Sequence, residues 1–537
     1  MKTANGKEIP FKLVGNSTFG RYSKISSEKS YNLFMTDEWE VDFFGWKKVG
    51  IWPVANGKGR GQFTSTRSGT IIAVIGSAVL SIDSNSVAKF IGDLKSSQGI
   101  VTFAENLNYQ ICICDSIDAY IFNTKTLSLT EQNMEDNFGF TPNTVDFHNT
   151  YFLFGNKDFT ADGAKWYVFS YATDTTIAYV ASPALQSKPD FALAVKRIPS
   201  GGDNVLVFGK TVTEIQTDVG AASVNIYQAV SSVSIDYGVA SIHTIASNDK
   251  IVVWLGVNEF NTPSLMMYSP EGARALTQVD SKGIDRTDGI DYLIENVKNP
   301  SAAFGYMLRR DGHLFYVITF PDDKDNFSLG YDFKTDGYIF LCDQHMDFFP
   351  PVSVSYFNGA SYFTSYINNG IYQISSNFVT YDENIDTSYE RLNYYIPRIR
   401  ICDNLRFPNS DQFIANLVRI TMENGNDIDY SALTVTENVT FITNESGEIL
   451  STENGKLMVT EDSRSNIPYV PRVDMAYSVD GGKTWSPYVS QPLRFDAVRQ
   501  NIVQWQNLGA CNDIVLKFFF WIKGHVVATS GIMEVRT

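Results

Sequence analysis

Short apolar strands separated by turn residues run through most of the chain, and residues 301–345 show this pattern clearly. From Phe304 to Leu341 the sequence reads FGYMLRRDGHLFYVITFPDDKDNFSLGYDFKTDGYIFL. Runs rich in aromatic and β-branched residues alternate here with Asp-Gly and Pro-Asp turn signals. The segment is therefore predicted to be an antiparallel meander of short strands.

Similar units follow one another between about residues 60 and 380, with starts roughly 40–50 residues apart. Each unit has a strand, a turn, an apolar strand, a second turn and a third strand, as in SGTIIAVIGSAVLSID and GASYFTSYINNGIYQIS. Repeats of four short strands at this period are typical of β-propeller blades, and about seven are expected. A pair of β-sandwiches is the competing fold, but it does not explain the period.

The pattern divides an all-β chain into three regions: an N-terminal arm at 1–55, a propeller at 56–384 and a C-terminal β-sandwich domain at 385–537. The arm is dense in aromatic residues without clear periodicity. We expect it to pack across a sheet edge or to reach a neighbouring subunit. Its candidate interface residues are Trp39, Phe43, Phe44 and Trp46.

The C-terminal domain carries a short β-repeat insertion at about residues 425–468. Residues 431–462 divide into the octads SALTVTEN, VTFITNES, GEILSTEN and GKLMVTED. The aligned carboxylates could hold a cation such as Ca²⁺, but the favoured interpretation is that they charge an otherwise sticky exposed ribbon. The ribbon is a candidate interface, through the apolar and acidic columns Leu433, Glu437, Phe441, Glu445, Ile449, Glu453, Leu457 and Glu461.

Composition supports strands and argues against a basic nucleic-acid-binding face. Aromatic residues make up 14% of the 537 residues, which favours pleated sheets. The net charge is −16, so phosphate binding is not evident. The five cysteines are scattered, which excludes a zinc ribbon or a disulfide framework and predicts buried free thiols. No secretory leader or membrane anchor is expected, because the longest apolar run, residues 70–80, is too short to span a bilayer.

The segment SVDGGKTW matches the Asp-box pattern Ser-x-Asp-x-Gly-x-Thr-Trp at Ser478, Asp480, Gly482, Thr484 and Trp485. In such a turn the carboxylate accepts backbone hydrogen bonds and the glycines supply positive φ. Asp boxes occur in sialidases and other propeller glycosidases, where they are structural and recur in several blades. Here the motif occurs once and outside the propeller, so a structural hairpin turn is predicted.

No catalytic, cofactor-binding or metal-binding residue can be assigned from spacing. A retaining glycosidase needs two closely placed carboxylates, and 59 acidic residues offer too many pairs for one to stand out. The five histidines show no ligand pairing. A propeller glycoside hydrolase of the sialidase kind and a host-glycan-binding tail protein remain the alternatives to a structural protein without cofactors.

The order of several segments resembles the packaged-DNA stabilisation protein, or tail hub, of short-tailed bacteriophages. The segments that resemble its opening blades are SYNLFMTDEW and GRGQFTSTRSGTIIAVIGSAVLSID. Its middle blades are similar to GDNVLVFGKTVTEIQTDVG and VSIDYGVASIHTIASNDKIVVWLG, and its closing domain is similar to YSVDGGKTWSP and WQNLGACNDIVLKFFFWI. The octads and the long arm depart from the family.

The resemblance implies a non-enzymatic tail component of the virion, assembled in the bacterial host cytoplasm. It implies a homo-oligomeric ring, a hexamer, below the portal and its adaptor ring. Such a ring closes the exit channel after packaging and attaches tail fibres, spikes or a needle. Packaged DNA would pass through an acidic lumen during genome ejection without sequence-specific contact.

Overall fold

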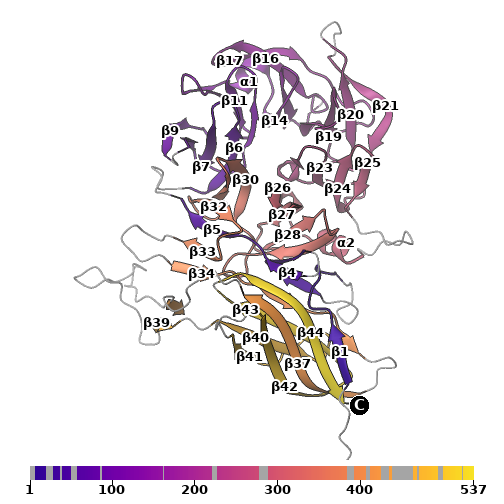
Figure 1. The fold of residues 1–537 in the computed structure, drawn as a ribbon. Helices are drawn as coiled ribbons and strands as arrows, with labels where there is room; N and C mark the ends of the chain where they lie inside the picture. The colour runs from indigo at the N-terminus through magenta and orange to yellow at the C-terminus, as the bar shows by residue number, and fades with distance from the viewer. Residues whose placement is uncertain are drawn as a thin grey trace, which may run out of the picture. The chain divides into compact units, whose positions relative to one another are not determined.

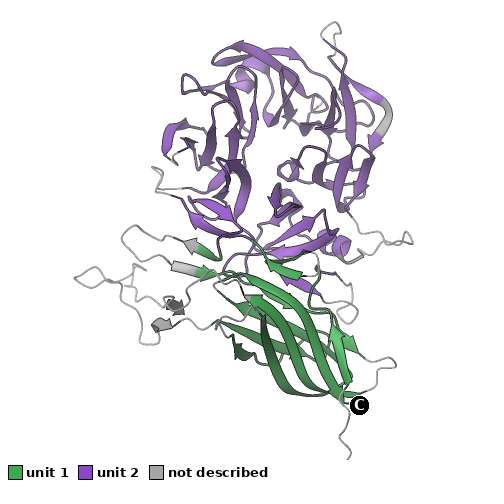
Figure 2. Ribbon diagram, in the orientation of Figure 1, with its two compact units in different colours: residues 1–15, 33–43, 379–537 green, residues 16–32, 44–378 purple. Residues whose placement is uncertain are grey.

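The computed structural model describes residues 7–19, 28–36, 39–49, 57–84, 87–160, 162–220, 226–276, 288–383, 392–406, 412–424, 434–437, 464–468, 471–493, 500–522 and 524–536. They form two compact units, built almost wholly from strands (Figures 1 and 2). Unit 1 comprises residues 1–15, 33–43 and 379–537, and unit 2 comprises 16–32 and 44–378. The all-β prediction is confirmed.

Unit 2 is a seven-bladed propeller, whose four-stranded sheets are arranged in a ring in Figure 1. Blade one consists of β6 (Gly59–Ser65), β7 (Thr70–Ile75), β8 (Ala78–Ile82) and β9 (Ala88–Asp93), and blade two of β10 (Thr102–Glu105), β11 (Gln110–Cys114), β12 (Ala119–Asn123) and β13 (Ser128–Glu131). Blade three consists of β14 (Pro142–His148), β15 (Tyr151–Asn156), β16 (Tyr167–Thr173) and β17 (Thr176–Ala181), and blade four of β18 (Ala194–Arg197), β19 (Asn204–Phe208), β20 (Thr213–Asp218) and β21 (Tyr227–Ile235). Blade five consists of β22 (Ala246–Ser247), β23 (Val252–Val257), β24 (Pro263–Ser269) and β25 (Gly272–Ala275), and blade six of β26 (Phe304–Arg310), β27 (His313–Phe320), β28 (Phe327–Asp332) and β29 (Gly337–Leu341). Blade seven consists of β30 (Pro351–Phe357), β31 (Ala360–Ser365), β32 (Ile371–Ser375) and β5 (Gly45–Lys48). Helices α1 (Met134–Phe138) and α2 (Asp288–Glu295) lie in links between blades.

The hydrophobic core of the propeller is divided among clusters shared by successive blades. In β11, Ile111 and Ile113 pack toward blade one, whereas Cys112 and Cys114 belong to the cluster with blade three. Successive side chains of a strand point to opposite faces, and both faces of a blade are covered. The middle strands are therefore continuous apolar runs, and this repeated apolar run is what makes the blades recognisable in the sequence.

The meander predicted from residue 304 onward is blade six, and its first turn follows the expected chemistry. Strands β26 and β27 are joined at Asp311 and Gly312, which have φ of 46° and 80°. Positive φ is strained for most residues and costs glycine little, which explains the Asp-Gly pair. The predicted strand order is confirmed, since β26 to β29 pair in sequence.

Two N-terminal strands add to blades of the propeller, so residues 1–55 are not a region of their own as the sequence pattern suggested. Strand β5 pairs antiparallel with β32, Trp46 opposite Ile374, and supplies the fourth strand of blade seven. Strand β2 (Lys29–Tyr31) pairs with β29 in parallel, at the outer edge of blade six. The sequence pattern did not reveal these strands because three- and four-residue strands are too short to show a period.

Unit 1 is a β-sandwich with its core between two sheets. One sheet has the order β3 (Leu33–Thr36), β4 (Trp39–Asp42), β44 (Val526–Arg536), β37 (Phe413–Asn424), β42 (Gln500–Cys511), with β1 (Lys7–Phe11) on β44. The other contains β35 (Ile399–Ile401), β36 (Leu405–Arg406), β43 (Asp513–Trp521), β40 (Arg472–Ser478) and β41 (Val489–Pro492). Val418, Trp505 and Phe518 lie in the core between them. Two further pairs are β33 (Thr380–Glu383) with β34 (Leu392–Tyr395), and β38 (Thr434–Glu437) with β39 (Arg464–Pro468).

The compact units differ from the expected boundaries at 55/56 and 384/385. Unit 1 begins its C-terminal part at Val379, and it also takes strands β1, β3 and β4 from the N-terminal segment. Strands β1 and β4 pair with β44, and β3 pairs with β4. The sandwich is therefore assembled from both ends of the sequence, and the N-terminal segment belongs alternately to the two units.

Candidate functional site

The innermost strand of every blade lines a central cavity of about 360 Å³ in the propeller. The lining strands are β6, β10, β14, β18, β22, β26 and β30. Central channels of propellers arise in this way, because the blades radiate from the axis. The channel is the first candidate for a functional site, since it is where seven blades bring side chains together.

The channel holds few charges. Among the described residues that line the channel, Lys196 is the charged one, and the Lys196 Nζ lies 3.3 Å from Oδ1 of Asp146. Burial lowers the pKa of His243 to about 4, so this imidazole is neutral at pH 7. Burial also raises the pKa of Tyr306, which stays a phenol. The electrostatics of the channel are thus set by one ion pair and by neutral groups.

This composition does not suit glycoside hydrolysis by paired carboxylates. None of the described residues that line the channel is Asp or Glu. A retaining or inverting hydrolase places two carboxyl groups on either side of the scissile bond. Among the residues that the structure describes, no three His, Cys, Asp or Glu side chains are grouped as a metal ion would require.

The Asp-box residues come together in a hairpin turn of unit 1. The Asp480 carboxylate accepts hydrogen bonds from Thr484 Oγ1 at 2.6 Å and from the Lys483 and Thr484 backbone N–H groups at 3.0 Å. These bonds, chiefly that from the Thr484 side chain, hold the pKa of Asp480 well below its usual range. Ser478 Oγ accepts from the Gly482 N–H at 2.8 Å, and Lys517 Nζ lies 4.8 Å from the Trp485 ring centre. The geometry is that of a turn whose polar groups satisfy one another.

The aromatic residues expected at an arm interface are mostly inside the chain. Trp46 is buried in blade seven, with ring centres of Phe349 and Phe363 at 5.5 and 5.7 Å. Phe43 packs edge-on against Phe34 in unit 1, and Phe44 packs under the Arg310 guanidinium in unit 2. Trp39 is half-buried in β4. Buried rings have little surface left for a neighbour, so these residues serve the chain's own core.

Most of the octad ribbon lies outside the described residues. Of its candidate residues, Glu437 lies in strand β38, opposite Arg464 of the paired strand β39. The remaining residues lie outside the described part of the chain: Leu433, Phe441, Glu445, Ile449, Glu453, Leu457 and Glu461. The prediction that they form an interface stays a prediction. The prediction of buried thiols is confirmed, since all five cysteines are buried and not in disulfide bonds.

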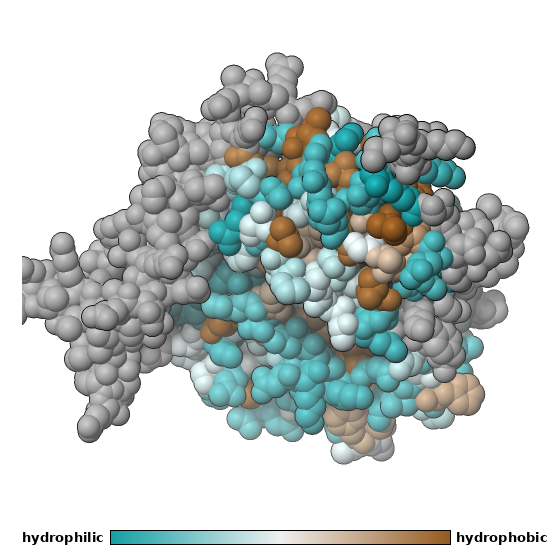
Figure 3. All heavy atoms as spheres, turned by 90° about the horizontal axis from the view of Figure 1, so that it is seen from below, coloured by the Kyte–Doolittle hydropathy of each residue, from teal (hydrophilic) through white to brown (hydrophobic). Residues whose placement is uncertain are grey.

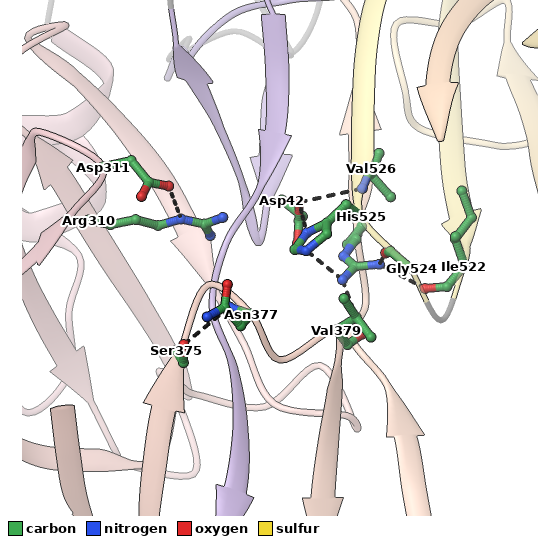
Figure 4. Close-up of polar contacts among 11 residues, drawn as sticks. Asp42, Arg310, Asp311, Ser375, Asn377, Val379, Ile522, Gly524, His525 and Val526 are labelled. Carbon is green, nitrogen blue, oxygen red and sulfur yellow. Dashed lines mark hydrogen bonds and ion pairs between the residues drawn. The ribbon is translucent and has the colours of Figure 1, made fainter. Parts of the chain in front are cut away.

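A buried ionic cluster in unit 1 was not predicted from the sequence. The Arg398 and Asp42 side chains are fully buried, with Nη2 3.3 Å from Oδ2. Figure 4 shows Asp42 facing His525 and Val526, and His525 Nδ1 lies 3.3 Å from Asp42 Oδ1. Arg398 Nη1 donates to the carbonyls of Ile522 and Gly524 at 2.7 and 2.8 Å. The cluster joins three segments that are distant in sequence.

One signal for this cluster is present in the sequence but is ambiguous. Arg398 and Arg400 alternate with isoleucines in IPRIRI, which would place two arginines on one face of a strand. Both are fully buried in the structure, and Arg400 Nε donates to the Leu13 carbonyl at 2.7 Å. Sequence alone does not identify Asp42 as the partner, because it is 356 residues away.

The surface seen in Figure 3 has hydrophobic residues in small groups among hydrophilic ones. Such scattered groups are common on soluble protein surfaces. No helix among the described residues is long and apolar enough to cross a membrane.

Comparison with known proteins identifies a family match. A family model described as Bacteriophage P22 Gp10, beta-propeller, matches residues 44–336, more than half of the chain. No curated protein matches the chain by sequence. Similar solved structures include a streptogramin B lyase, with TM-score 0.40 and 10% identity over 63% of this chain and 99% of that one. The WD40 propeller domain of Doa1 has TM-score 0.37 and 9% identity over 62% and 98%.

Proposed function

We propose that this chain is a structural component of a phage tail hub, because it belongs to the phage stabilisation family of β-propellers represented by bacteriophage P22 Gp10. In this role it forms a homo-oligomeric ring of six copies below the portal and its adaptor, and it helps to retain packaged DNA. The observation that carries the proposal is the family match, which extends from near β5 into blade six.

The propeller channel is too small to be the DNA conduit. A cavity of about 360 Å³ holds on the order of ten water molecules. In the proposed ring, the exit channel for DNA therefore lies between copies of the chain. The net charge of −16 supports a lumen that repels phosphates, so that DNA slides during ejection without sequence-specific contact.

Contacts with other virion proteins complete the role. The ring binds the portal adaptor on one side and provides attachment for fibres, spikes or a needle. Large apolar side chains are exposed on the propeller, including Tyr356 and Phe159. Exposed aromatic residues are enriched at protein interfaces, which supports this part of the proposal.

Retention of DNA by virus particles tests the function. Particles made in cells whose phage carries an early stop codon in this chain should fill with DNA and then lose it. The measurement is the fraction of packaged DNA that DNase digests, with and without the chain supplied from a plasmid. Particles that keep DNase-resistant DNA in the absence of the chain would contradict the proposal. A purified chain that cleaves a sialoside would favour the glycosidase alternative instead.

A further inference from the structure

One end of the propeller carries an open groove between blades two and three. In a meander, successive turns alternate between the two ends of the strands. The turn between β11 and β12, the link from β13 to β14 and the turn between β15 and β16 are therefore at the same end. Together they line a groove of about 950 Å³. Pockets of this size commonly hold a ligand or an anchoring side chain.

The groove has apolar walls and an apolar floor. Phe159 is 63% exposed and Ile117 is 50% exposed, and both line the groove. Phe140 lies beneath, stacked on Tyr167 with ring centres 3.6 Å apart. Phe159 is supported from one side by Phe191, at 5.1 Å in an edge-to-face contact. The exposed side chains of Phe159 and Ile117 thus lie beside the buried, stacked ring of Phe140.

The charges around the groove are mainly negative. Glu135 and Asp158 line it. Thr160 donates to both Asp158 oxygens, at 2.8 and 2.5 Å, and these bonds lower the pKa of that carboxyl. The lining lysine, Lys157, donates from Nζ to the Ser116 carbonyl at 2.7 Å. The groove therefore complements a positive charge placed next to an apolar group.

We propose that this groove binds an extended peptide segment of another virion protein, one that places a large apolar side chain beside a lysine or arginine. The apolar side chain packs on Phe140 between Ile117 and Phe159, and the cation faces Glu135 and Asp158. An open groove formed by three loops suits an extended chain better than a small molecule, which needs enclosure. This names an attachment surface for the proposed hub, and it rests on that role.

A library of random twelve-residue peptides displayed on filamentous phage is the probe. Peptides are selected on the full chain and then depleted on a Phe159→Ser variant. We expect enriched peptides that pair an aromatic or aliphatic residue with Lys or Arg. Measured by calorimetry, their affinity should fall at least tenfold with Phe159→Ser or with Ile117→Ser. Glu135→Gln should also weaken binding, and added salt should do the same.

Phe260→Ser is the matched control. Phe260 is 80% exposed in the turn between β23 and β24, at the same end of the propeller but outside the groove. This variant should bind the peptides within twofold of the unchanged chain. Two results would overturn the proposal: a selection that yields no peptide, or peptides that bind the Phe159→Ser and Ile117→Ser variants as well as the parent. The native mass of the chain's assembly is measured separately, so failure of the groove leaves the ring proposal open to its own test.

Discussion

Replacing Asp42 with asparagine removes one charge from the buried cluster of unit 1 while keeping the side chain's size. Asp42 and Arg398 have no exposed side-chain surface, and their charged atoms are 3.3 Å apart. Without the carboxylate, the Arg398 guanidinium keeps bonds to the carbonyls of Ile522, Gly524 and Val379. Neutral carbonyls do not balance a buried charge.

Removal of one partner from a buried ion pair typically costs about 3–5 kcal/mol. We expect Asp42→Asn to lower the opening free energy of unit 1 by about this amount. Hydrogen exchange measured on peptides from β37 and β44 reports that free energy for unit 1 separately from the propeller. Exchange in blades two to five should be unchanged. The double variant Asp42→Asn with Arg398→Met should recover much of the loss, because it removes both charges of the buried pair.

Asp249→Asn is the matched control for the chemical change. Asp249 pairs with Arg309 at 3.1 Å, but their side chains are 86% and 69% exposed. Exposed pairs contribute about 0–1 kcal/mol, so little change is expected. Two results would refute the reasoning about the buried cluster. In the first, Asp42→Asn lowers the opening free energy of β37 and β44 by less than about 1 kcal/mol. In the second, this loss is no larger than the loss that Asp249→Asn causes in the region around Asp249.

Three further predictions concern the propeller and the Asp-box hairpin. Trp46→Ala should destabilise the closure of blade seven by about 3–5 kcal/mol, because a buried indole leaves a cavity, and exchange in β32 should accelerate. Burial raises the pKa of Asp118 to about 6, so the folded chain binds its proton more tightly than the unfolded chain does. Stability of blade two should therefore fall as pH rises from about 4 to 6, and Asp118→Asn should remove this dependence. Asp480 has a lowered pKa, so its contribution to the hairpin should be present above about pH 4 and be lost as pH falls through the folded pKa.

Each of these three has an outcome that contradicts it. Unchanged exchange in β32 would mean that β5 does not close the ring. A pH dependence of blade two that persists in Asp118→Asn would assign it to other carboxyls. Carboxyl titration by NMR that gives Asp480 an ordinary pKa would show that the Thr484 hydrogen bonds do not form in solution.

The blades could be predicted from sequence because their contacts are local. Each strand pairs with the next, each turn has its own Asp, Asn or Gly, and the buried middle strands are apolar on both faces. The closure of blade seven by β5 could not be predicted in this way. Its pairing with β32 joins residues more than 300 positions apart, and the four-residue strand GWKK has no period of its own.

The candidate residues, too, could be interpreted from the sequence only where their contacts are local. The Asp box was interpretable because its hydrogen bonds lie within eight residues. The aromatic residues near Trp46 suggested an interface because apolar density alone does not distinguish a core from a contact surface. No sequence pattern indicated the groove at Phe159, because its three loops become adjacent only when two blades pack side by side.

The central claim, that the chain is a ring-forming hub, is tested most directly by the native mass of its assembly. Native mass spectrometry of the full chain, alone and with the portal-adaptor protein of its phage, gives this mass. The account predicts a closed complex with six copies of a 60.1 kDa chain. A chain that stays monomeric at all concentrations, even in the presence of the adaptor, would contradict it.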